Sequence, residues 1–230
     1  MTTVMDNGQT YLSGSIDPNK DPNYRNPLSD PCVEKVSQFM LFSDDYVIVD
    51  GRRFTVQAMA TDSLYLDMMP HPVIAGKHTL NTPNDAIITY KLAKRLFKNE
   101  NPIGKTLKVS TGDVVTVTGV IDEPSTKASV QFEIIISKNL RNSWSRMASE
   151  LVQLHRAEDV TELNKKNQKP MELLAYGKRP IFYQLTSLKD FYMNHNLLVY
   201  DKVLRGNRTS LSILTIVALS LIHISEPTRH

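Results

Sequence analysis

Cysteine is almost absent from this chain of 230 residues, which contains only Cys32. A single thiol excludes an intramolecular disulfide and a zinc site built from cysteines. Glycine and proline are sparse, at 9 and 12 residues, which excludes collagen-like and low-complexity chains. An excess of one charge is also lacking, because 27 basic and 24 acidic residues leave a net charge of +3. This balance predicts no nucleic-acid partner, although a local basic patch stays open.

What the chain does contain is an apolar content of 41%, enough to bury a core in one or two domains. The N-terminal part is the exception, since it is polar and interrupted by Pro18, Pro22, Pro27 and Pro31. It lacks the basic and apolar regions of a secretory signal peptide. Because proline breaks helices, we expect an extended polar lead-in over residues 1–32.

Alternating and apolar segments predict the elements that follow the lead-in. Asp50-Gly51 predicts a tight hairpin turn, which the basic pair Arg52-Arg53 could lengthen. Strand–helix–strand patterns occur in both halves, so we predict an α+β fold of mixed sheets with β-hairpins, with helices on one face of a sheet. Strands are predicted over 33–42, 46–49, 54–58, 85–89, 106–109, 114–121, 132–136, 151–154 and 181–185, and helices over 62–69, 90–97 and 157–169.

The tripeptide Gly104-Lys105-Thr106 invites comparison with a phosphate-binding loop. That loop needs a glycine five positions before its Gly-Lys pair, so that the backbone can curl around a phosphate. Here position 99 is asparagine and Pro102 intervenes. We interpret the tripeptide as a turn that enters a strand, and we expect no nucleotide cofactor.

Histidines and carboxylates follow no recognisable catalytic or metal-binding pattern. No two histidines stand four residues apart on a helix, and no serine-elbow motif occurs. The adjacent carboxylates Asp44-Asp45 and Asp122-Glu123 lie in turn contexts, and Cys32 has no identifiable base partner. We therefore predict no catalytic, cofactor-binding or metal-ligating residues and interpret the histidines as isolated surface residues. They are His71, His78, His155, His195, His223 and His230.

A basic and aromatic cluster surrounds the only tryptophan, with Lys138, Arg141 and Arg146 flanking Trp144. Such a cluster can contact nucleic acid or an acidic partner. We interpret it as a solvated turn with one anchoring indole.

An apolar stretch without formal charge, LSILTIVALSLIHI, occupies residues 211–224. It is shorter than the roughly 20 residues that span a bilayer, so a buried or interfacial helix competes with an interrupted membrane helix. The final residues resemble the conceptual translation of a sequencing-library adapter over 219–229. We expect a truncated transmembrane helix to begin over 209–218 and an adapter artefact to occupy 219–230, with a genuine polar tail as the alternative.

The order of segments resembles the periplasmic core domain of MacB/FtsX-type ABC transporter permeases, especially the long permeases of Bacteroidetes. The strongest likeness is DAIITYKLAKRLFKNENPIGKTL, with an apolar strand, a helix and a Pro-Ile-Gly-Lys turn in the family's order. Further matching segments are PCVEKVS, ATDSLYLDMMPHPVIAGK, VVTVTGVIDEPSTKASVQFEIIIS, PIFYQLTSLKDFYMN and NRTSLSILTIVA.

Several positions depart from the family's pattern. Val130 stands where the family often has histidine, Leu185 where a proline is expected, and Pro70 and Pro72 in a stretch that is usually glycine-rich. A first membrane helix is expected upstream of Met1. These departures leave topology and oligomer contacts open.

The resemblance implies a core domain over 33–208, placed in the periplasm and anchored in the cell inner membrane. Such permeases work with a cytoplasmic ABC ATPase, separate or fused, relay its motion to an adaptor or substrate protein, and form dimers. They perform no covalent chemistry in this domain. The first alternative is a soluble periplasmic binding or adaptor module. The second is a hydrolase with a site assembled from Asp44, Asp122 and a histidine.

Overall fold

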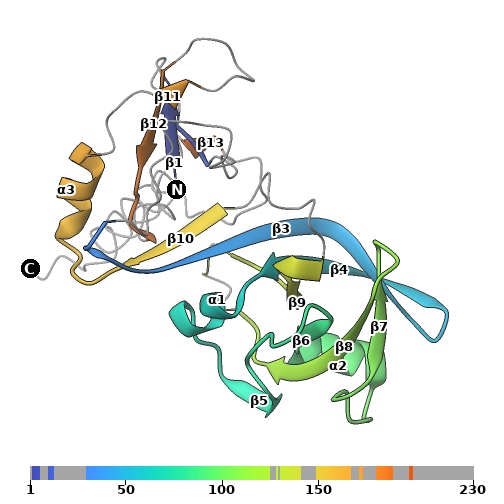
Figure 1. Cartoon of the computed structure of the whole chain (residues 1–230). Coiled ribbons are helices and arrows are strands. Elements are labelled where there is room, and N and C mark those ends of the chain that lie inside the picture. The colour runs from blue at the N-terminus through green and yellow to red at the C-terminus, as the bar shows by residue number, and fades with distance from the viewer. Residues whose placement is uncertain are drawn as a thin grey trace, which may run out of the picture.

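Two mixed β-sheets organise the described chain, one of eight strands and one of five (Figure 1). The larger sheet runs in the order β10-β3-β4-β9-β6-β8-β5, and β7 pairs with both β3 and β8. Because β7 pairs with both β3 and β8, six of these strands form a closed ring, which we call the barrel. They are β3, β4, β9, β6, β8 and β7. Closure leaves these strands with few free edges.

The computed structural model describes residues 2–5, 10–12, 30–124, 128, 130–140, 149–166, 171–172, 180–188 and 197–198. Its elements are β1 (Thr2–Met5), β2 (Thr10–Leu12), β3 (Val33–Val49), β4 (Arg52–Thr61), α1 (Ser63–Met68), β5 (Val73–Gly76), β6 (Asp85–Thr89), α2 (Tyr90–Phe97), β7 (Thr106–Val109), β8 (Val114–Ile121), β9 (Ile134–Ser137), a 3₁₀ turn (Lys138–Leu140), β10 (Ser149–Leu154), α3 (Asp159–Lys166), β11 (Met171–Glu172), β12 (Pro180–Gln184) and β13 (Leu197–Leu198).

Strand β3 is one strand of 17 residues, where the sequence predicts two separated by a polar gap. A β-bulge bridges that gap, because Phe42 pairs with Ala58 but the next pair is Asp45 with Val56. In the bulge Asp44 has φ 62°, a left-handed conformation that aspartate adopts more readily than most residues. The Ser-Asp-Asp run therefore bends the strand without ending it.

The hairpin between β3 and β4 confirms the predicted tight turn. Val49 pairs with Arg52 across Asp50 and Gly51, whose φ angles of 49° and 74° are both positive. Two consecutive positive φ angles match the right-handed twist of a hairpin. The basic pair does not lengthen the loop, because Arg52 and Arg53 both pair with β3.

The segment from β6 to β8 has the bounds that the sequence predicts. All five residues of β6 are buried, and the Thr89 hydroxyl caps α2 by accepting from the Leu92 N–H at 3.4 Å. Gly104 has φ 84° just before β7, so the Gly-Lys-Thr tripeptide is a turn that enters a strand, as predicted. Elsewhere, β9 and β10 each differ from the prediction by two residues at their start, and α3 begins two residues later than predicted.

Two hydrophobic cores lie on opposite faces of the central strands. In β6, Ala86 and Ile88 belong to one core and Ile87 to the other, as the alternation of a strand requires. All six barrel strands contribute to the first, the barrel core, which α2 also contacts. The second, the outer core, is covered by α1. The prediction that the helices share one face of a sheet is therefore wrong for α1 and α2. The outer core comprises Phe39, Met59, Tyr65, Leu66, Leu80, Ile87, Ile121, Phe132 and Ile135.

The strand β5 was not predicted, because Pro70 and Pro72 precede it in a stretch that suggests a loop. It pairs with β8 at close range, and the Lys77 N–H donates to the Thr118 carbonyl at 2.9 Å. A Cβ atom on Gly119 would lie 1.8 Å from the Lys77 carbonyl oxygen. Glycine is therefore required at position 119 for β5 to join the sheet.

The five-stranded sheet, which we call the terminal sheet, runs in the order β11-β12-β1-β2-β13. Strand β1 pairs with β12 in antiparallel fashion, and β13 pairs with β2 in parallel fashion. The sequence predicts an extended lead-in over residues 1–32. Two short strands, β1 and β2, lie within it and pair with each other. Strands from the first and last parts of the described chain meet in one sheet.

The predicted membrane helix over 209–218 and the adapter segment over 219–230 lie outside the described residues. Within the described residues, no helix combines the length and apolarity needed to cross a bilayer. The domain boundary at residue 32 stays a prediction.

Candidate functional site

The residues of the hydrolase hypothesis are not gathered in one pocket. Asp44 lies in the bulge of β3, whereas Asp122 follows β8 and donates its backbone N–H to the Pro72 carbonyl at 2.9 Å. Burial lowers the pKa of His71, and the carboxylate of Asp122 opposes that shift. The pocket that His71 lines contains neither aspartate.

The interpretation of the histidines as isolated surface residues is wrong for His71. Its half-buried ring packs edge-on against Phe132 at 5.3 Å, and it shares a pocket of about 330 Å³ with His78. His155 is exposed and donates its backbone N–H to the Cys32 carbonyl at 3.0 Å. In the described part of the chain, no group of three or more potential ligands could hold a metal ion. The other histidines, His195, His223 and His230, lie outside the described residues.

Cys32 is half-buried beside Asp30, whose carboxylate accepts from the Cys32 N–H at 3.2 Å. Burial and the neighbouring carboxylate raise the pKa of this thiol, which disfavours the reactive thiolate. Of the predicted basic and aromatic cluster, only Lys138 lies within the described residues. Arg141, Trp144 and Arg146 lie outside them.

Lys138 belongs to a polar cluster around one carboxylate, Asp62, at the start of α1. The Ser37 hydroxyl donates to Asp62 Oδ1 at 2.6 Å, and the Gln38 N–H and Lys138 Nζ donate to Oδ2 at 3.3 and 2.8 Å. With its neighbour Phe39, this cluster forms what we call the junction, made of Ser37, Gln38, Phe39, Asp62 and Lys138. It ties the first half of β3 to the barrel through α1 and the 3₁₀ turn.

Phe39 marks the point where β3 passes from one set of partners to another. It pairs with Thr61 of β4 on one side and with Ser149 of β10 on the other. Its ring packs on Tyr65 at 5.7 Å, and Tyr65 packs edge-on against Phe132 at 6.4 Å. Burial raises the pKa of the Tyr65 hydroxyl. The junction is thus continuous with the outer core.

Sequence reasoning missed the role of Asp62. The sequence indicates either Thr61 or Asp62 as the residue that caps this helix. Asp62 is the N-cap residue of α1, but its side chain makes no capping hydrogen bond. The partners lie 25, 24 and 76 residues away along the chain. No local pattern could have indicated them.

An exposed apolar edge flanks the barrel at β5, the last strand of the sheet order. Val73 and Ile74 are 45% and 49% exposed, and Leu64 on α1 is 40% exposed. Beside them lies the pocket that His71 and His78 share, which is also lined by Leu66, Asp67, Pro70 and Val73. An apolar edge strand next to a pocket is the type of surface that accepts an extended segment of another protein.

The chain belongs to the family of MacB-like periplasmic core domains, whose model matches residues 3–168. This family forms the periplasmic domains of ABC transporter permeases. A search of curated proteins found no significant match.

Solved structures agree with this assignment at the level of the fold. A domain assigned to a permease protein of Porphyromonas gingivalis is 18% identical, with TM-score 0.58, over 94% of this chain and 93% of that one. The periplasmic region of MacB from Actinobacillus actinomycetemcomitans is 17% identical, with TM-score 0.54, over 83% and 89% of the two chains. The extracellular domain of the ABC-type transporter YknZ from Gram-positive bacteria is 17% identical, with TM-score 0.52, over 71% and 88%.

Proposed function

We propose that the chain is the extracytoplasmic domain of an inner-membrane permease subunit that carries ATP-driven motion outward for export or for lipoprotein or cell-envelope processes. A cytoplasmic ABC ATPase supplies the motion, and an adaptor or substrate protein receives it outside the membrane. The working permease is a dimer. In this account the domain makes and breaks no covalent bonds.

The observation that carries the proposal is the continuity of β3. Its first half pairs with β10 from Val33 to Phe39, and its second half pairs with β4 and β7 inside the barrel. Figure 1 shows β3 as the long strand that runs from the side of β10 and α3 into the barrel. Under this proposal a displacement of one half moves the other, because packed elements transmit motion as rigid bodies.

The junction stabilises this lever where it meets α1. Asp62 is 19% exposed and Lys138 is 37% exposed, so their ion pair is partly shielded from water. The Thr61 hydroxyl donates to the backbone carbonyl of Gln38 at 2.8 Å, and the side-chain amide of Gln38 donates to the Glu150 carboxylate of β10 at 3.2 Å. One short part of β3, around Ser37 and Gln38, is thereby connected to four other elements: β4, β10, α1 and the 3₁₀ turn.

The terminal sheet supports anchoring of both ends in one membrane. Because β1 and β13 lie in the same sheet, separated only by β2, the chain before residue 2 and after residue 198 departs from one region. Membrane helices at both borders require such an arrangement.

The proposal is tested in vesicles that contain the full-length permease and its ATPase. A spin label replaces Lys108, an exposed residue of β7. The distance from this label to labelled lipids in the membrane is measured without nucleotide and with trapped ATP. We expect the barrel to move between the two states, and Asp62→Ala to reduce the movement while ATP hydrolysis persists. Val114→Ala, on the exposed face of β8, serves as the control. An unchanged label position in both states would reject the proposal.

The apolar edge at β5 favours a second candidate, a soluble periplasmic module that binds a partner and relays no motion. Membrane fractionation of the native protein separates the two candidates. Release by high salt favours the soluble module, whereas retention until detergent is added favours the permease.

A further inference from the structure

The exposed side of α2 is strongly basic. Lys91, Lys94, Arg95 and Lys98 are all exposed, and no acidic residue occurs between Tyr90 and Lys98. Tyr90 is itself 42% exposed, and Lys94 Nζ lies 5.5 Å from its ring centroid. We call these five residues the basic face.

Only one cation of the basic face forms an ion pair within the described residues, although Glu123 lies beside Lys91 and Glu100 is close enough to feel the charge of Lys98. Arg95 pairs with Glu133 at 2.9 Å, but within the described residues Lys91, Lys94 and Lys98 form no ion pair. Near α3 two cations are paired instead: Arg156, just before the helix, with Asp159 at 2.8 Å, and Lys166 with Glu162 at 2.9 Å. The two helices therefore differ in how much positive charge they leave for a partner.

Helix stability does not explain the whole basic face. Lys94 and Arg95 lie in the last turn, where the helix dipole favours cations. Lys91 lies in the first turn, where a cation is unfavourable. Its backbone N–H donates to the Glu123 carboxylate at 2.6 Å, but its ammonium group forms no ion pair within the described residues.

The basic face continues onto the hairpin of β3 and β4. The Arg95 guanidinium donates to the Thr55 carbonyl at 2.9 Å, and Thr55 pairs with Tyr46 across the strands. Arg53 stacks over the Tyr46 ring, with its Cζ 3.5 Å from the centroid. Cations beside exposed aromatic rings are typical of protein interfaces.

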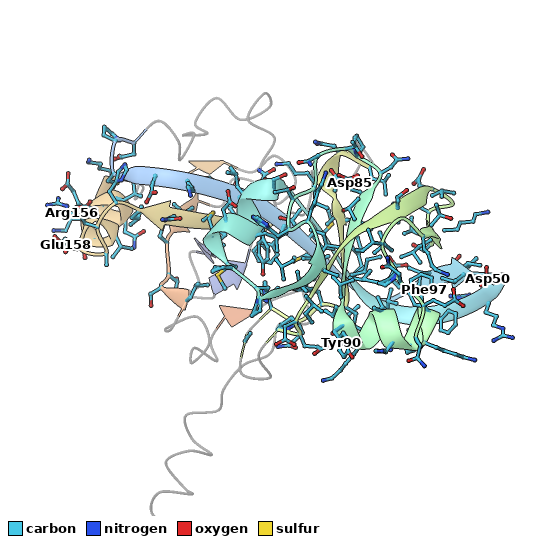
Figure 2. All side chains as sticks on the ribbon, turned by 90° about the horizontal axis from the view of Figure 1, so that it is seen from below. Asp50, Asp85, Tyr90, Phe97, Arg156 and Glu158 are labelled. Carbon is cyan, nitrogen blue, oxygen red and sulfur yellow. The ribbon has the colours of Figure 1, made fainter. Side chains whose placement is uncertain are left out.

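This surface lies away from the end of the molecule that carries α3. Figure 2 shows Arg156 and Glu158 at one end of the molecule and Phe97 of α2 in the other half, with Tyr90 nearer the middle. Figure 1 places the terminal sheet in the same half as α3. Under the proposed function, on which this step rests, the membrane adjoins the terminal sheet. An acidic protein is therefore a better fit to the basic face than an anionic lipid surface.

We propose that the basic face docks an acidic segment of a partner protein, with Tyr90 as its aromatic anchor. The carboxylates of the segment pair with the three lysines, and the Tyr90 ring contacts its apolar atoms. The attraction is mainly electrostatic, so it weakens as salt screens the charges.

Binding is measured with the 230-residue chain and a fluorescent peptide of alternating glutamate and alanine at low ionic strength. The variant Lys91→Gln/Lys94→Gln/Lys98→Gln is compared with Lys35→Gln/Lys77→Gln/Lys165→Gln, which removes the same charge elsewhere. We expect the first to weaken binding about tenfold and the second less than about twofold, as exposed charge pairs of ordinary strength would give. Tyr90→Ser should weaken binding without changing its salt dependence.

Equal loss in both triple variants, or no binding at all, would overturn the proposal. Vesicles of phosphatidylglycerol and phosphatidylcholine in equal parts provide the second probe, and tighter binding to them than to the peptide would assign the surface to lipid instead. Neither measurement involves ATP. A failure here is thus separate from a failure of the ATP-driven movement described above.

Discussion

The barrel core and the junction are built by different physical means. Barrel strands bury aliphatic side chains that alternate along each strand, such as Ala86 and Ile88 in β6 and Val115 and Val117 in β8. The junction joins polar and aromatic groups that come from distant parts of the chain, around the single carboxylate of Asp62.

The barrel core therefore gives the domain a rigid part, and the junction couples this part to the first half of β3. Close-packed aliphatic cores resist deformation, so the barrel behaves as one body. The junction relies on a few directional hydrogen bonds to a charged carboxylate, which are worth about 1.5–3 kcal/mol each. Substitutions in the barrel core should therefore destabilise the whole domain, whereas substitutions in the junction should loosen the connection and leave the stability of the barrel nearly unchanged.

The largest effect is expected for Leu107→Ala, since Leu107 is fully buried in the barrel core. The cavity should lower the free energy of unfolding by about 2–5 kcal/mol. Denaturant titration followed by circular dichroism measures this change. Val114→Ala on the neighbouring strand is the control, with an expected change below about 0.5 kcal/mol because Val114 is 49% exposed. Equal effects of the two variants would contradict the assignment of the barrel core.

Gly119→Ala should destabilise the sheet where β5 joins β8, because the new Cβ would collide with the Lys77 carbonyl. We expect a loss of about 1–3 kcal/mol and faster hydrogen exchange at the Lys77 amide. Gly51→Asn, at the hairpin turn where nothing lies within 4 Å of an added Cβ, should leave that exchange unchanged. Protection of the Lys77 amide in the Gly119→Ala variant would show that the close contact is absent.

Asp62→Ala should affect the junction without unfolding the barrel. Removing the carboxylate leaves the Ser37 hydroxyl and the Gln38 N–H without this acceptor, at a cost of about 1–3 kcal/mol. Hydrogen exchange should accelerate at the Gln38 amide and stay slow at the Ile135 amide in β9. Uniform acceleration at both sites would mean that the junction and the barrel form a single cooperative unit.

The smallest expected effect is the contribution of Asp85 to the loss of stability at acidic pH. Burial alone would raise the pKa of Asp85, but hydrogen bonds from Thr82 and Asn81 and the charge of Lys77 lower it overall. A folded-state pKa below the unfolded value of about 3.9 means that Asp85 stabilises the fold above that pH. This contribution is lost as the pH falls through the folded-state pKa.

Unfolding free energies measured between pH 5 and pH 3 test the role of Asp85. Asp85→Asn should remove part of the decline with acid that the native chain shows. An identical pH dependence in the native chain and Asp85→Asn would contradict the hydrogen-bond pattern around this carboxylate.

The barrel was largely predictable because its signals are local. Asp50-Gly51 specifies the hairpin turn, and the apolar run of β6 followed by the periodicity of α2 specifies a buried strand and an amphipathic helix. The family was also predictable, because the order of these segments resembles MacB-like domains and the family model confirms it.

The junction, β5 and the faces of the helices were not predictable from local patterns. Asp62 meets partners up to 76 residues away, and β5 depends on the space that Gly119 leaves beside Lys77. The pairing of β3 across its bulge likewise depends on β4 and β7, since the polar run itself suggests a loop. Tertiary contacts decide such features, and local propensity does not.

The central claim, that β3 joins its first half to the barrel as one lever, is tested most directly by an intramolecular distance. Spin labels at positions 35 and 108, in a chain with Cys32→Ser, report on the two halves of the lever. We predict a single narrow distance distribution in the native background that broadens in the Asp62→Ala variant. A distribution already broad without that substitution would contradict the claim.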